Sequence, residues 1–341
     1  MKHILGIFDA HHKTTGLLAT ATVYSPLMTP DDPDLTVRAR GLTRRYNTHL
    51  AVDSLDLDLK RGEILGLLGP NGAGKTTTMQ MLTGNIAPSS GEILIRGHDL
   101  LESPTRAKSC IGYLPETPPL YRELNVGEYL HFAARLHRVG KAERPGAIER
   151  TMQRCGLKTV ARKLIGTLSK GYQQRVGIAQ AIVHEPDVVI LDEPTVGLDP
   201  NQILEIRALI RELGREHSVI LSTHIMQEVE AVCDRVQIMH HGKVVFSNTV
   251  DDLRAGHNSR AISLRLHRPP SLEILRSISG VAAVEDRGSG SYLLRFEPGS
   301  DPTAMLVSRA GTENWGLHQL VPAHSSLEEI FAQLTGSENK S

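Results

Sequence analysis

The feature that most constrains the fold of this chain is a glycine-rich run between a strand-like and a helix-like segment. The apolar run 64–68 has the composition of a buried strand, and residues 77–82 have helical character. Between them the sequence matches G-x-x-x-x-G-K-[ST], in the strand–loop–helix context that marks a phosphate-binding loop. The loop residues, with the threonine that follows them, are Gly69, Pro70, Asn71, Gly72, Ala73, Gly74, Lys75, Thr76 and Thr77. The sequence therefore predicts a nucleotide-binding α/β fold.

The spacing of this loop follows from the chemistry of phosphate binding. Glycines let successive backbone N–H groups converge on the β-phosphate without clashes from Cβ atoms, and the start of the next helix adds the positive end of its dipole. Lys75 is predicted to bridge the β- and γ-phosphates, and the Thr76 hydroxyl to ligate Mg²⁺. At an average glycine usage of about 7%, a chance match in a chain of this length is on the order of one in a hundred.

A second group of polar residues follows two other apolar runs. The run 188–191 ends in Asp192 and Glu193, and the run 218–223 ends at His224. Carboxylates at the C-terminal edge of a parallel sheet face the crevice where such folds bind ligands. Asp192 is predicted to hold Mg²⁺ and Glu193 to accept a proton from an attacking water, whereas one acidic residue alone would be an ordinary strand end. His224 is predicted to contact the γ-phosphate, although a single histidine is ordinarily a core residue.

The composition, with the spacing of the cysteines and of the apolar residues, argues against several classes of protein. The 38 basic and 38 acidic residues cancel, so no global basic field points to nucleic acid as a partner. Cys110, Cys155 and Cys233 are odd in number and far apart, which favours reduced thiols over a zinc site or a disulfide framework. No apolar run approaches the roughly 20 residues that span a bilayer, and the N-terminal stretch is a poor signal peptide. We therefore expect a cytoplasmic protein that reaches a membrane only through a partner.

The order of the segments predicts three parts. Residues 1–34 are expected to form a loose extension, and 35–256 alternate β-rich and helical runs, as in a mostly parallel sheet. Residues 257–341 are expected to form a small α+β domain. Its strands (261–266, 281–285, 292–296 and 317–321) and helices (271–279, 303–310 and 325–334) follow the ferredoxin-like order βαββαβ with a closing helix.

One further motif connects these features to a family. Residues 168–175, Leu-Ser-Lys-Gly-Tyr-Gln-Gln-Arg, resemble the ABC signature Leu-Ser-Gly-Gly-Gln and lie just upstream of the acidic run. With the phosphate loop, a D-loop-like Gly-Leu-Asp-Pro at 197–200 and the Thr-His pair at 223–224, the chain from about 35 to 255 resembles an ABC transporter ATP-binding subunit. The resemblance implies an antiparallel β subdomain and a helical subdomain at about 117–167.

The resemblance also implies an activity and partners. Such a subunit binds and hydrolyses ATP with Mg²⁺, pairs head to tail with a second copy, and drives a separate multi-helix permease from the inner face of the membrane. The implied site residues outside the phosphate loop are Tyr46 for adenine stacking, Ser169, Lys170, Gly171 and Tyr172 for the opposite protomer's site, and Asp199 in the D-loop. Ser169 is also expected to cap a helix over 173–183.

Two departures from the family pattern stand out. Glu116 occupies the position of the Q-loop glutamine; its carboxylate could ligate Mg²⁺ but cannot donate an amide hydrogen bond. Lys170 and Tyr172 stand where Gly and Gln are usual, which resembles an exporter branch with gliding-motility-type and multidrug-type members. Residues 326–331 resemble the tail of that branch.

Two alternatives to a transport ATPase can be weighed from the sequence. Soluble ABC ATPases of translation usually carry two cassettes and those of repair carry long heptad arms, whereas this chain has one phosphate loop and no sustained heptads. A non-hydrolysing regulatory module would not need Glu193 and His224. The sequence therefore favours the transporter subunit, while the cargo is left open because cargo recognition lies in the permease.

Overall fold

The computed structural model describes residues 34–256, 261–297, 299–323 and 331. The predicted extension 1–34 therefore lies outside the described residues except for Asp34. Residues 257–259, which the sequence predicts to be a linker at the start of the C-terminal domain, also lie outside them. Within the described part, no helix has both the length and the apolar character needed to cross a bilayer.

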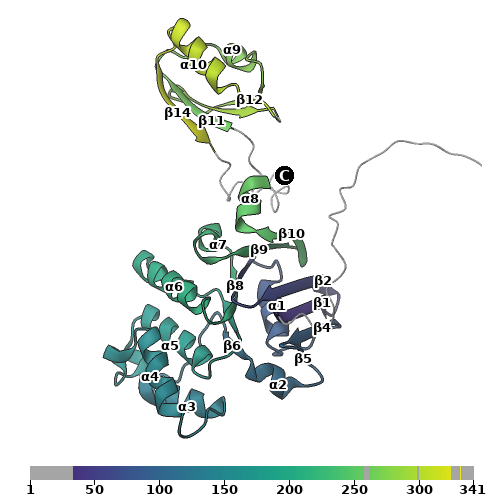
Figure 1. The fold of residues 1–341 in the computed structure, drawn as a ribbon, viewed down its shortest axis with the longest axis vertical. Helices are drawn as coiled ribbons and strands as arrows, with labels where there is room; N and C mark the ends of the chain where they lie inside the picture. The colour runs from purple at the N-terminus through teal and green to yellow at the C-terminus, as the bar shows by residue number, and fades with distance from the viewer. Residues whose placement is uncertain (1–33, 257–260, 298, 324–330, 332–341) are drawn as a thin grey trace, which may run out of the picture. The chain divides into compact units, whose positions relative to one another are not determined.

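A six-stranded sheet forms the centre of the nucleotide-binding part, in the order β10-β9-β3-β8-β7-β6 (Figure 1). All neighbours in it are parallel except β10 and β9. Alternate residues of its strands enter two different hydrophobic cores: Val189 and Leu191 face one, Val188 and Ile190 the other. This double burial explains the unbroken apolar runs in the sequence. The strands are β3 (Ile64–Leu68), β6 (Ile111–Leu114), β7 (Val188–Asp192), β8 (Ser218–Thr223), β9 (Arg235–His240) and β10 (Lys243–Thr249).

A second, antiparallel sheet has the order β2-β1-β4-β5. Its two long strands form a hairpin whose turn lies between Tyr46 and His49, with Asn47 at a positive φ of 50°. Its core joins that of the central sheet, with α1 contributing Met79, Met81 and Leu82. The elements are β1 (Leu35–Tyr46), β2 (His49–Lys60), β4 (Ser90–Ile95), β5 (His98–Asp99), α1 (Lys75–Leu82) and α2 (Pro104–Ser109).

Helices cover the other face of the central sheet. The cluster there joins Val126 and Leu130 of α3 with Val176 of α5 and Ile210 of α6. A capping box between Asn125 and Glu128 fixes the start of α3. The helices are α3 (Val126–Leu136), α4 (Arg144–Arg154), η1 (Lys158–Val160), η2 (Ile165–Thr167), α5 (Lys170–Ile182), α6 (Pro200–Leu213), α7 (Met226–Val232) and α8 (Val250–Gly256).

The C-terminal part is the predicted ferredoxin-like unit. Its sheet has the order β12-β13-β11-β14 with all neighbours antiparallel. Both helices contribute to one core with the sheet, and Figure 1 shows them on the same side of it. The elements are β11 (Ala261–Leu266), α9 (Leu272–Arg276), β12 (Val281–Asp286), β13 (Ser291–Phe296), α10 (Thr303–Thr312) and β14 (Leu317–Ala323). Most of the expected closing helix lies outside the described residues; Phe331, which is described, packs against a cluster around α7 and α8.

Several helix limits differ from the sequence-based prediction. The helix after the phosphate loop begins at Lys75 rather than at residue 77, and the signature helix begins at Lys170 rather than at residue 173. Both first turns are polar, so no apolar periodicity marks them. In the C-terminal part, α9 ends at Arg276 rather than near residue 279.

Candidate functional site

The phosphate loop turns directly from the end of β3 into α1. Gly72 and Gly74 have positive φ values of 81° and 104°, a region that favours glycine. Two loop glycines also lie against neighbouring backbone: a Cβ on Gly69 would lie 2.5 Å from the Met239 carbonyl oxygen, and one on Gly74 would lie 2.5 Å from that of Ala51. The glycines therefore allow the loop's conformation and its close approach to β2 and β9.

Lys75 is buried at the first turn of α1. Its ammonium donates to the Gly69 carbonyl at 2.8 Å and to the Pro70 carbonyl at 3.3 Å. It also lies 3.4 Å from Glu193 Oε1. The cation is thus held at the rim of its own loop, where a phosphate would meet it.

The end of β7 places two carboxylates one residue apart. Asp192 is buried, and its Oδ1 accepts a hydrogen bond from the Ser222 hydroxyl of β8. The same hydroxyl accepts from the Glu193 N–H at 3.0 Å. Glu193 has a φ of 47°, an unusual conformation for a residue with a side chain. Ser222 therefore links the end of β8 to the turn that directs Glu193 into the site.

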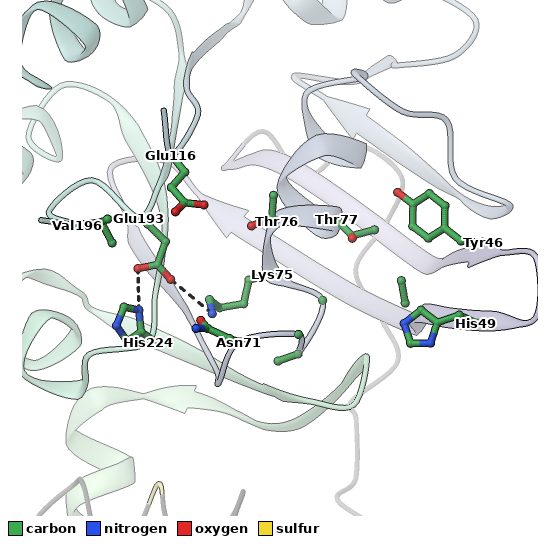
Figure 2. A pocket seen from close by; sticks show the side chains of 14 residues that line it. Tyr46, His49, Asn71, Lys75, Thr76, Thr77, Glu116, Glu193, Val196 and His224 are labelled. Carbon is green, nitrogen blue, oxygen red and sulfur yellow. Dashed lines mark hydrogen bonds and ion pairs between the residues drawn. The ribbon is translucent and has the colours of Figure 1, made fainter. Parts of the chain in front are cut away.

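Glu193 lies between two partners, as Figure 2 shows. Its Oε1 faces Lys75, and its Oε2 lies 2.9 Å from Nδ1 of His224. The carboxylate is almost fully buried, whereas the His224 side chain is 43% exposed. The two contacts fix the orientation of the carboxylate at the wall of a cavity.

That cavity has a volume of about 530 Å³ and lies along the phosphate loop (Figure 2). The site residues from the sequence that line it are Tyr46, Asn71, Gly72, Ala73, Gly74, Lys75, Thr76, Thr77, Glu116, Glu193 and His224. The lining residues do not include Gly69, Pro70 or Asp192. Each of these nevertheless contacts a residue that lines the cavity: Gly69 and Pro70 accept hydrogen bonds from Lys75, and Asp192 accepts one from Thr76. His49, Ala51 and Val196 also line it and were missed by sequence reasoning. His49 pairs with Tyr46 across the β1–β2 hairpin. The short turn between the two residues could have predicted that His49 lies next to Tyr46 at the site.

Comparisons with known proteins agree with this geometry. The family model for the ABC transporter matches residues 52–196. A bacitracin transport ATP-binding protein of Bacillus licheniformis is 40% identical over 220 residues, which make up 64% of this chain and 71% of that protein. A daunorubicin resistance ATP-binding protein of Streptomyces coeruleorubidus is 31% identical over 313 residues, 90% of this chain and 98% of that protein. The chain belongs to the ABC transporter ATP-binding proteins.

Solved structures show the same relationship. The structure of cbiO1 from Clostridium perfringens, part of the ABC transporter complex cbiONQ, is 30% identical, with a TM-score of 0.60 over 65% of this chain and 91% of that one. This ABC protein is thus an ATP-binding subunit of a transporter, in a family whose domains are generally ATPases and work as dimers with membrane permease components. The reading as a soluble ABC ATPase is not favoured.

Tyr46 lies at the far end of the cavity of this ABC protein from Glu193 (Figure 2). Tyr46 is 40% exposed, and the Arg44 guanidinium lies over its ring at 4.7 Å from the ring centroid. A half-exposed aromatic face at the end of a phosphate site suits stacking with a base.

Oxygen atoms that could ligate a metal ion lie near Thr76. Its hydroxyl lies 3.5 Å from Asp192 Oδ1, and Glu116 lines the same cavity. Burial raises the pKa of Asp192; hydrogen bonds from Ser222 and Thr76 oppose this, and the charges of Glu193 and Glu116 add to it. A cation would relieve this concentration of negative charge, and a hydroxyl with carboxylates is the kind of donor set that Mg²⁺ uses. Within the described residues, no group of three or more His, Cys, Asp or Glu could hold a metal ion alone, so phosphate oxygens would have to complete such a site.

The signature residues of the ABC protein do not line this cavity. Ser169 is the N-cap of α5 and accepts a hydrogen bond from the Tyr172 N–H at 3.5 Å. Lys170 reaches the turn after Glu193, since a Cβ on Gly197 would lie 2.1 Å from its Nζ. Gly171 is buried against Gln202, and Asp199 caps α6 through the Gln202 N–H at 3.0 Å. These residues therefore lie outside the pocket formed by the chain's own phosphate loop.

Proposed function

We propose that this chain hydrolyses ATP at the cavity beside the phosphate loop and thereby drives export through a separate membrane permease. One observation carries the proposal: a buried Glu193 carboxylate, held between Lys75 and His224, faces the cavity next to the phosphate loop. The relatives named for bacitracin transport and daunorubicin resistance support export as the direction.

Each residue has a distinct part in the proposed reaction. The phosphate-loop N–H groups and Lys75 bind the β- and γ-phosphates, and Tyr46 stacks on the adenine. Glu193 accepts the proton of the water that attacks the γ-phosphorus. His224 orients this carboxylate and contacts the γ-phosphate. Because both contacts of Glu193 are already formed in the structure, little reorganisation of the base is needed.

Mg²⁺ fits the donors present. Thr76 and Asp192 would hold it, with Glu116 on the same side of the cavity. The bound ion would neutralise charge on the phosphate oxygens. Glu116 therefore brings a negative charge near Asp192, at the position where the family usually has the neutral amide of the Q-loop glutamine.

The site of one chain is completed by a second copy. Ser169, Lys170, Gly171 and Tyr172 lie outside the chain's own cavity, and so does Asp199. In a head-to-tail homodimer they would close the partner's site, with the Ser169 hydroxyl and the N-terminus of α5 directed at the γ-phosphate. ATP binding then brings the two chains together, and hydrolysis releases them, while the permease carries the cargo.

The decisive experiment separates binding from hydrolysis with two variants. Glu193→Gln should bind ATP with near wild-type affinity but stall hydrolysis, because an amide cannot accept the proton. Lys75→Ala should lose tight ATP binding, because the paired cation is gone. Exposed Lys141→Ala is the matched control and should behave as wild type. Calorimetric titration with MgATP measures binding, and phosphate release measures hydrolysis; a Glu193→Gln protein that hydrolyses at the wild-type rate would overturn the proposal.

A further inference from the structure

A fourth carboxylate lies directly behind the site and takes no part in the reaction described above. Glu228 is in the first turn of α7 and is only 2% exposed. Its Oε1 accepts a hydrogen bond from the Thr195 hydroxyl, and its Oε2 accepts one from the Thr223 hydroxyl at 2.6 Å. Both threonines are buried as well. One carboxylate therefore joins two chain segments that are far apart in sequence.

The two threonines flank the two residues that face the cavity. Thr195 follows Glu193 by two positions, and Thr223 directly precedes His224. The Thr223 hydroxyl also accepts from the Ile225 N–H at 3.1 Å, so it spans the backbone on both sides of His224. The positions of Glu193 and His224 relative to each other thus depend on the ends of β7 and β8 being held together from behind.

The turn at Glu193 needs such support. Its φ of 47° is a strained conformation for a residue with a side chain, and it persists only when the surroundings impose it. Ser222 holds the front of the turn through the Glu193 N–H, and Glu228 holds its far side through Thr195. Hydrogen bonds to a buried carboxylate are among the stronger ones in proteins.

We propose that Glu228 is a positioning residue for ATP hydrolysis: by binding Thr195 and Thr223 it sets the Glu193–His224 geometry. This inference rests on the proposed function, since it assigns Glu228 an effect on the step that Glu193 performs. A buried residue that only stabilises α7 would not act specifically on this step. The effect of Glu228 should instead pass through Glu193 and lower the rate of hydrolysis at saturating ATP.

The first test uses conservative variants of the full-length protein. Glu228→Gln, Thr195→Val and Thr223→Val keep the shape of each side chain while removing a charge or a hydroxyl. We expect each to lower kcat by about tenfold or more, because small displacements of a reacting group are costly. KM for ATP and the MgATP affinity should change less than about twofold, because the phosphate loop is untouched. Glu230→Gln, two residues further along α7, is the matched control and should leave kcat unchanged.

The second test is a double-mutant cycle with Glu193→Gln. If Glu228 acts through Glu193, adding Glu228→Gln to Glu193→Gln should not slow single-turnover hydrolysis further. A merely structural residue would reduce the residual rate additively in both backgrounds. If Glu228→Gln fails to fold, Thr195→Val and Thr223→Val take its place in the cycle, because each removes one hydrogen bond to Glu228.

The outcomes distinguish this inference from the proposed function. If wild type and Glu193→Gln hydrolyse ATP equally fast, the proposed function fails and the inference fails with it. If Glu193→Gln is stalled but Glu228→Gln and both valine variants keep the wild-type kcat, the positioning role alone is wrong. Additive effects in the cycle would overturn it too. A lowered kcat with unchanged ATP affinity and a non-additive cycle would support it.

Discussion

At the scale of single residues, His184 carries an ionisable ring in a place that disfavours its charge. Its ring stacks on that of His137, with centroids 3.8 Å apart, and its Nε2 lies 3.0 Å from the Ile111 carbonyl oxygen. The pKa of His184 is lowered to about 4, mainly by burial and also by the charges of His137 and His217, while the hydrogen bond with the Ile111 carbonyl opposes the shift. The pKa of His137 is lowered by burial too.

This shift predicts acid sensitivity of the fold. Below the ordinary histidine pKa of 6.5 the unfolded chain binds a proton at this position, whereas the folded chain does so only near pH 4. Stability is therefore lost as the pH falls from 6.5. His184→Phe keeps a flat ring for His137 to stack on, and this ring cannot be protonated. The melting temperature of the variant minus that of wild type should therefore rise by a few degrees when the pH is lowered from about 7.5 to 5. His131→Phe, at an exposed position, is the control. If the melting temperatures of wild type and His184→Phe fall equally as the pH is lowered, the prediction is wrong.

At the scale of elements, β6 and α5 pack unusually closely at Gly112. A Cβ on Gly112 would lie 2.0 Å from the Ala181 carbonyl oxygen, so only glycine lets the strand and helix pack at this distance. The strand leads to Glu116, and the helix begins at the cap Ser169. This contact therefore joins the segment that lines the cavity to the helix that carries the signature.

Gly112→Ala should destabilise the nucleotide-binding part by about 2 kcal/mol or more, because backbone on both sides must move. Gly311→Ala in α10 is a suitable control: nothing lies within 4 Å of the added Cβ, so it should be neutral or slightly stabilising. Thermal unfolding followed by circular dichroism measures the first. Fluorescence of the chain's single tryptophan, Trp315, reports on the C-terminal part for the second. An unchanged melting temperature for Gly112→Ala would show that the helix can move away at little cost.

The sequence predicted elements wherever burial leaves a periodic signature. The apolar runs at β3, β7 and β8 were recognisable because both faces of these strands are buried, and the alternation in β11 because one face is. The starts of α1 and α5 were not, since Lys75 and Lys170 are polar and the caps Gly74 and Ser169 decide where each helix begins. Motif spacing predicted most of the polar residues that line the cavity, but it missed His49 and included Asp192, which does not line it. The contact between Glu228 and Thr195 joins residues 33 positions apart, and no local pattern encodes it.

At the scale of the whole molecule, the C-terminal part has a hydrophobic core of its own. Leu275, Leu294, Leu306 and Trp315 belong to it, and none of the residues that line the cavity comes from this part. Removing residues 257–341 should therefore leave ATP affinity near that of the full chain, as measured by titration with MgATP. If the deletion weakens ATP-dependent dimerisation of the Glu193→Gln protein in gel filtration, this part supports the dimer.

The deletion has one structural side effect to control for. Phe331 packs against a cluster that includes Met226 and Leu253, and the deletion removes it. Full-length Phe331→Ala isolates the loss of that contact. Loss of ATP binding in a folded deletion protein would show that the division of labour is wrong, whereas unchanged dimerisation would favour a passive role for the C-terminal part.

The position of Ser169, outside the cavity of its own chain, also bears on how the rate should depend on protein concentration. If a catalytic unit needs the phosphate loop of one molecule and the α5 cap of another, dilute protein should turn over ATP with a rate that grows as the square of its concentration. Specific activity should then rise on concentrating the sample and level off once most molecules are paired. A mixture of Lys75→Ala and Ser169→Arg proteins, each inactive alone, should regain up to about a quarter of the wild-type rate, because half the random pairs contain one intact combination of loop and cap. Specific activity that stays constant on dilution to nanomolar protein would mean that a single chain suffices.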